Sequence, residues 1–176
     1  MSTQTLTPEL VNWAKRIALE VDPDNEDLAP MMLNAYLQGG QNRKQLFERD
    51  AVVGSFSSEG ILPLLAFAFT ALSLIGKELM ELQVSGGLDA INGLLSAWKT
   101  WLEALKARQS LKEKASTEGK RDEYASLYRI LQKVEKSLRK RGLSREQSEL
   151  LTYQVIKSLL EEPDEGAKII AEFPSE

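Results

Sequence analysis

The sequence predicts an all-α protein, a helical bundle of about seven helices around a central hydrophobic helix at about residues 60–83. The uncharged segment 60–76 is rich in Leu, Ala and Phe, a composition that favours helix over strand. Elsewhere, apolar residues recur at alternating spacings of three and four, as on the buried face of a helix. Proline, glycine and capping residues separate these periodic segments, as they do at helix ends.

The central segment reads GILPLLAFAFTALSLIG, and an amphipathic continuation extends it to Leu82. Pro63 falls near the first helical turn, where its missing N–H breaks little. A helix that is apolar on every side is either the centre of a bundle or a membrane span. The uncharged part is about 25 Å long, at the lower limit for a hydrocarbon core of about 30 Å. Its flanks show no Lys and Arg asymmetry and no aromatic belt, so burial in a bundle is the favoured interpretation.

The N-terminal part predicts a helix over Pro8–Val21, because Thr7 can cap it and proline occupies its first position. The acidic stretch 22–27 predicts a turn, and a short helix follows that ends at a glycine pair. We expect a third short helix at 41–50 and a connection of small residues at 51–57.

The clearest periodicity in the chain predicts a helix over about residues 88–115. If the glycine turn before it is tight, this helix forms an antiparallel hairpin with the central helix. Three residues of its apolar stripe are then expected to face the central helix: Leu95, Trp98 and Leu102.

The charge content rises after residues 116–119, which mark a soft boundary. We therefore divide the chain into a helical core with the hydrophobic hairpin, 1–115, and a charged helical part, 116–176, packed on the same bundle. The second part predicts helices at about 120–141 and from Ser144 to Glu162, the latter opened by a capping box. The expected apolar contacts of that capped helix are Leu150, Leu151, Val155, Leu159 and Leu160. A last short helix carries Ile169, Ile170 and Phe173.

The composition argues against catalysis. The chain has no histidine and no cysteine, which removes imidazole acid–base chemistry and a thiol nucleophile. No phosphate loop, dinucleotide motif or nucleophile elbow occurs. We therefore expect no enzyme activity, no catalytic residue, no cofactor and no metal. The first residues lack the basic and apolar regions of a secretory signal, so we expect a cytoplasmic protein.

Two groups of residues are candidates for function. The first is the interaction or membrane segment, with Leu64, Leu65, Phe67, Phe69, Leu72, Trp98 and Trp101. The second is a candidate anion-binding patch of Lys136, Arg139, Lys140, Arg141 and Arg145. Cations are also favourable at a helix C-terminus, which is the simpler explanation of the patch. The net charge of −4 and the lack of a recognised motif do not favour nucleic acid as a partner.

A helical bundle that holds one membrane-like helix resembles, in outline, the membrane-targeting helical effector domains of the HeLo and Bell type in fungal and bacterial immunity. It also resembles small helical adaptor modules. We predict a non-catalytic protein–protein interaction module, an adaptor or complex subunit, with a protein partner or self-association. The alternative is a membrane-active effector of an immune or conflict system. Its helix 61–75 would be sheathed at rest and would bring the protein to a membrane on activation.

Overall fold

The fold is given by a computed structural model that describes residues 6–48, 64–82, 87–108 and 121–174, without the side chains of 101–108 and 121–124. These residues form eight α-helices and one 3₁₀ helix, and no strand occurs among them, which confirms the all-α prediction. The helices are α1 Pro8–Val21, the 3₁₀ helix η1 Pro23–Leu28, α2 Ala29–Gln38, α3 Gly40–Gln45, α4 Leu64–Leu82, α5 Gly87–Arg108, α6 Arg121–Lys140, α7 Arg145–Glu161 and α8 Pro163–Glu172.

The N-terminal helices begin where the sequence indicates. The Thr7 hydroxyl accepts a hydrogen bond from the Leu10 N–H and caps α1. The acidic stretch 22–27, predicted as a turn, lies instead mostly within η1. α3 is shorter than predicted, and residues 51–57 of the expected connection lie outside the described residues.

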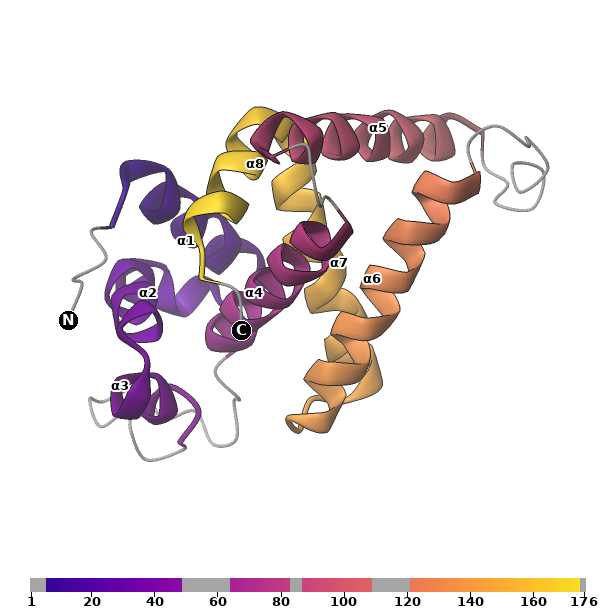
Figure 1. Ribbon diagram of the computed structural model, residues 1–176. Coiled ribbons are helices and arrows are strands. Elements are labelled where there is room, and N and C mark those ends of the chain that lie inside the picture. Colours follow the sequence, from indigo (N-terminus) through magenta and orange to yellow (C-terminus); the bar gives the residue numbers. More distant parts are fainter. Residues whose placement is uncertain (1–5, 49–63, 83–86, 109–120, 175–176) are drawn as a thin grey trace.

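The apolar helix α4 is the centre of the bundle, as predicted. It packs against α1, α2, α6, α7 and α8, and Figure 1 shows it in the middle of the molecule. Leu65, Phe69 and Leu72 are completely buried. Enclosure of residues 64–76 explains why this part of the helix carries apolar residues on every side, whereas its last turns are partly exposed. The first residues of the predicted helix, 60–63, lie outside the described residues.

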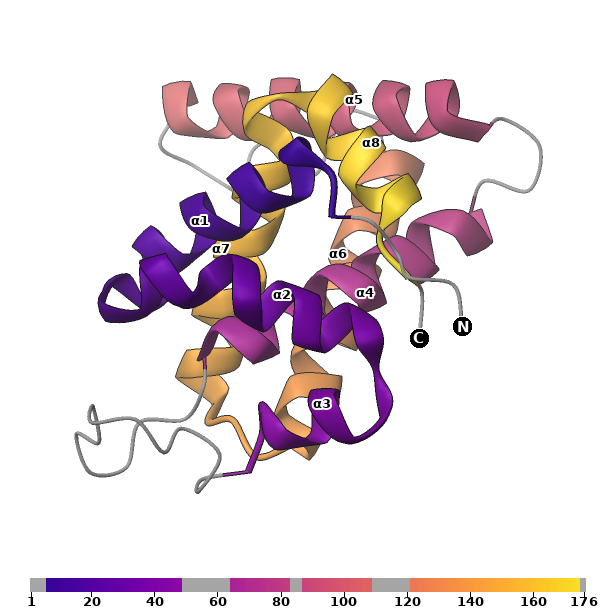
Figure 2. The ribbon, with the colours of Figure 1, turned by 90° about the vertical axis from the view of Figure 1, so that its left-hand side faces the viewer.

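The predicted hairpin of α4 and α5 is wrong. α5 packs mainly on α8, with further contacts to α7 and α6, and Figure 2 shows α8 between α5 and α4. Leu95 and Trp98 are buried, while the side chain of Leu102 lies outside the described residues. α8 passes next to Gly76 of α4. A Cβ at position 76 would make an ordinary van der Waals contact with Ile170 Cγ2, 3.6 Å away.

The helices α6 and α7 form an antiparallel pair joined by a short turn. Gly142 takes φ 108° in this turn, a backbone conformation that glycine adopts without strain. The predicted capping box opens α7. The Ser144 N–H donates to Gln147 Oε1, and the Gln147 N–H donates to Ser144 Oγ, both at 3.1 Å. α7 therefore starts as a well-fixed helix.

α8 follows α7 after a tight bend. Gly166 lies against the backbone of α7, and a Cβ at this position would meet the Leu159 carbonyl oxygen at 2.4 Å. Because glycine lets the backbones of α7 and α8 come this close, the bend between them is tight. After the bend, α8 packs on α4 and α5. Beyond α8, the Ser73 hydroxyl donates to the Pro174 carbonyl at 2.7 Å and ties the end of the described chain to α4.

Candidate functional site

The predicted interaction or membrane segment lies in the core of the bundle. Its buried members are Leu65, Phe67, Phe69, Leu72 and Trp98. Leu64 is half-buried, and the side chain of Trp101 lies outside the described residues. In this fold the buried members are therefore not available to a partner at the surface.

Four aromatic side chains join the N-terminal helices to α4 and to the residue after α8. The Phe69 ring centroid lies 6.1 Å from that of Trp13 and 5.6 Å from that of Tyr36. Phe173 lies 6.4 Å from Trp13 and 5.7 Å from Tyr36. Ring pairs at these separations add to the stability that burial itself provides. All four rings are buried, and the cluster is part of the structural core.

The polar ends of two of these aromatic residues are satisfied within the protein. The Trp13 Nε1–H donates to Ser158 Oγ at 2.9 Å. The Tyr36 hydroxyl donates to Thr70 Oγ1 at 3.3 Å and accepts a hydrogen bond from Arg43. The Arg43 guanidinium also lies 3.9 Å from the centroid of the Tyr36 ring, within the range of a cation–π contact. These contacts fix α3 to the core.

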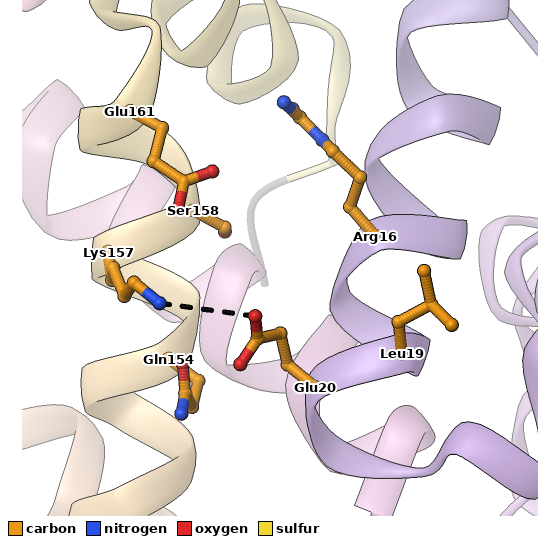
Figure 3. Close-up of a pocket in the computed structure, with 7 residues that line it drawn as sticks. All are labelled: Arg16, Leu19, Glu20, Gln154, Lys157, Ser158 and Glu161. Carbon is orange, nitrogen blue, oxygen red and sulfur yellow. Dashed lines mark ion pairs between the residues drawn. The ribbon is translucent and has the colours of Figure 1, made fainter.

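A groove of about 160 Å³ runs between α1 and α7 (Figure 3). Its lining residues are Arg16, Leu19 and Glu20 from α1 and Gln154, Lys157, Ser158 and Glu161 from α7. Sites for drug-sized ligands usually enclose about 300–1,000 Å³, so this groove is small. Its two cations and two carboxylates balance, which gives no preference for a charged ligand.

Ser158 is the nearest approach to a nucleophile in this groove. Its hydroxyl donates to the Val155 carbonyl at 2.7 Å and accepts from Trp13, so both contacts are structural. The neighbouring Lys157 Nζ points to Glu20 Oε1, 3.9 Å away, as Figure 3 shows. The serine and the lysine therefore do not form the nucleophile–base pair that covalent catalysis needs.

Two buried polar atoms at the groove have no hydrogen-bond partner within the described part of the chain: Arg16 Nε and Gln154 Oε1. Figure 3 shows these residues on opposite helices and at opposite ends of the groove. No other buried side-chain polar atom of the described groove residues is left without a partner beside either of them. They do not define a common binding site.

A second hollow lies on the other side of Arg16, where α1 meets η1 and α8. It measures about 430 Å³. Its lining residues are Asn12, Lys15, Arg16, Leu19, Glu26 and Glu165. As in the groove, two cations face two carboxylates. The surface of α1 is therefore evenly charged on both of its sides.

Glu165 has the most crowded electrostatic environment at this end of α1. Burial raises the pKa of its carboxyl above the ordinary value of 4.5. The Arg16 guanidinium, 2.9 Å away, lowers the pKa, while the hydrogen bond and charge of Glu162 and the charge of Glu9 raise it. The net effect is a carboxyl group whose charged form is disfavoured in the folded protein.

We expect Glu165→Gln to be more stable than the wild type at neutral pH, with a difference that disappears on acidification. The folded state binds the Glu165 proton more tightly than the unfolded state does. The free energy of unfolding of the wild type therefore rises as the pH falls through the raised pKa and levels off below the ordinary value. Glutamine removes this step and still accepts a hydrogen bond from Arg16. Urea unfolding from about pH 7 to about pH 4 measures the difference, and a difference that does not change with pH would contradict this account.

The candidate anion-binding patch lies at the end of α6, in the turn and at the start of α7. Its members are exposed: Lys136, Arg139, Lys140, Arg141 and Arg145. The Arg145 Nε–H donates to Glu149 Oε1 at 2.7 Å, so this member already has a carboxylate partner. Farther along α6, Lys133 contacts Glu78 of α4 at 2.6 Å. The patch is an exposed cationic edge of the bundle, and no cavity is formed by its residues among the pockets described above.

The outward face of α7 is a feature that the sequence prediction missed. Leu150, expected in the core, is 61% exposed, and Tyr153 on the same face is 47% exposed. Glu146 and Lys157 extend this face toward the two ends of the helix. The four residues follow one another at spacings of four, three and four. This spacing is the sequence signal that could have revealed a second stripe on α7.

Comparison with protein families, characterised proteins and solved structures finds no match for this chain. Within the described residues, no helix combines the length and apolar character needed to cross a membrane. The same part of the chain contains no group of three or more side chains placed to hold a metal ion. The residues themselves are therefore the basis for inferring function.

Proposed function

We propose that this protein is a non-catalytic helical interaction module, an adaptor or complex subunit that binds another protein through helix surfaces. The observation that carries this proposal is the pair of large exposed side chains on α7, Leu150 and Tyr153. Exposed apolar and aromatic residues on a rigid element are typical of interface anchors. The opposite face of α7 is fixed in the core, and its start is fixed by the capping box.

The remaining features of the molecule also support an interaction role. The most apolar segment, α4, is used for internal packing. The hydroxyl of Ser158 is engaged in internal hydrogen bonds. The groove between α1 and α7 is small and has balanced charge. The outer helix surfaces are thus the best candidates for recognition.

A photo-crosslinking amino acid in place of Tyr153 tests the proposal in cells that produce the protein naturally. We expect a discrete protein adduct from position 153. The same amino acid at Met31, which is 63% exposed on α2, is the matched control. Absence of a protein adduct from position 153, or equal adducts from both positions, would refute a binding role for α7.

The membrane-active alternative requires α4 to leave the core. Release of α4 would expose to water the apolar surfaces of the five helices that pack on it. Burial of apolar surface contributes about 25 cal/mol per Å², so such a release needs a strong compensating interaction. The interaction module needs no such rearrangement, and we therefore prefer it.

A further inference from the structure

The exposed stripe on α7 has an ordered chemistry. From the N-terminal end it presents an acid, two apolar side chains and a base: Glu146, Leu150, Tyr153 and Lys157. Residues at these spacings share one face of a helix. The other face of α7 carries Leu151, Val155 and Leu159, which are buried in the bundle. The stripe therefore points away from the core along about three helical turns.

This order is complementary to itself when two copies of α7 run in opposite directions. The acid of one helix then lies opposite the base of the other, and Leu150 lies opposite Tyr153. Both pairings share one register, because the two-fold axis falls midway between Leu150 and Tyr153. We propose that α7 is the interface of a two-fold symmetric dimer, in which the partner is a second copy of this chain. This inference rests on the proposed function and names the partner.

The surroundings of the stripe suit a second copy. Tyr128 on α6 is 62% exposed, and α6 packs beside α7. Leu19 on α1 is 53% exposed and lines the groove on the α1 side of α7. A two-fold axis counts each side chain that lies within the interface twice. The additional apolar area matters because a stable interface usually buries about 1,200–2,000 Å² in total, more than one helix pair supplies.

The charges also favour a dimer contact through the α7 stripe and disfavour one through the cationic edge at the end of α6. One acid and one base make the stripe neutral, whereas a symmetric contact through the edge of α6 would oppose like charges. Lys157 is available for a new partner, because its contact with Glu20 is 3.9 Å long and both side chains are more than one-third exposed. Exposed ion pairs of this kind contribute little. Lys157 can therefore exchange Glu20 for Glu146 of the second copy.

Sedimentation velocity over a range of protein concentrations tests the dimer. We expect the wild type to dimerise, and Glu146→Lys and Lys157→Glu each to weaken dimerisation by about tenfold or more, because each opposes like charges twice. An equimolar mixture of the two variants should form a mixed dimer, since opposite charges then face each other at both ends. Asp24→Lys and Lys168→Glu are controls at exposed positions outside the stripe. They should leave dimerisation unchanged.

Circular dichroism shows whether each variant remains folded, and restored assembly in the mixture shows that the loss did not come from unfolding. A wild type that stays monomeric up to about 1 mM would overturn the dimer. A mixture that fails to assemble, or single variants that dimerise like the wild type, would also overturn it. A monomeric wild type combined with an adduct to a different protein at position 153 would overturn the dimer alone. Absence of any protein adduct would overturn the proposed function as well.

Discussion

Replacing Leu72 by alanine is expected to lower the free energy of unfolding by about 2–5 kcal/mol, the range for truncating a buried leucine. Leu72 is completely buried in α4, which is surrounded by five other helices. Because neighbours on every side hold their positions, the space left by the side chain cannot be filled by a simple shift of one surface helix. Urea unfolding followed by tryptophan fluorescence measures the loss, since Trp13 and Trp98 are both buried.

Leu150→Ala is the matched control, because it makes the same chemical change on the exposed face of α7. At a protein concentration where the chain is monomeric, it should change stability by no more than about 0.5 kcal/mol. A similar cost at Leu72 and Leu150 would show that α4 is not the centre of the core. A large cost at Leu150 alone would assign the outward stripe to internal packing.

The starts of α1 and α7 were the most predictable part of the fold, because they depend on residues close together in sequence. Thr7 and Pro8 start α1, and Ser144 with Gln147 starts α7, by contacts within one helical turn. The central position of α4 was also predictable. A helix without a polar face has no side that water can solvate favourably, so a soluble fold must surround it.

The partner of α5 could not be read from the sequence in the same way. An apolar stripe specifies that a helix is covered, and it does not specify by which helix. The chain order favoured α4 because it comes immediately before α5. α8 takes this place: it packs on α5 and on α4, its Ile169 and Ile170 are buried, and Ile170 lies next to Gly76 of α4. This choice depends on residues about ninety positions apart.

The outward stripe of α7 was missed for a related reason. Adjacent residues of a helix point about 100° apart, so two neighbouring leucines need cover on two sides to be buried together. Leu159 and Leu160 have that cover near the bend into α8, where Lys99 of α5 also contacts the Glu161 carbonyl. Nearer the start of α7, Leu151 is buried and Leu150 is exposed. Only the tertiary arrangement distinguishes the two leucine pairs.

Replacing Ala68 by aspartate is expected to destabilise the fold by several kcal/mol. Ala68 is completely buried in the apolar middle of α4, where a carboxylate would lose its hydration and find no cation. Ala68→Leu changes volume without charge, and overpacking a tight core typically costs about 1–3 kcal/mol. Thermal and urea unfolding of both variants should therefore rank aspartate as the more damaging change. A fold that tolerates aspartate at this position would contradict the buried placement of α4.

The same two variants separate the interaction module from the membrane-active alternative. A carboxylate at the centre of a membrane helix costs about 2.5–3.5 kcal/mol on insertion scales, so Ala68→Asp blocks insertion as well as weakening the fold. Ala68→Leu distinguishes the two functions, because it destabilises the packing of the other helices around α4 and adds no charge to α4. The interaction module predicts that neither the wild type nor Ala68→Leu releases dye from anionic or neutral liposomes at neutral or acidic pH. Leakage that persists or grows in Ala68→Leu while its fold weakens would make the sheathed helix the better explanation.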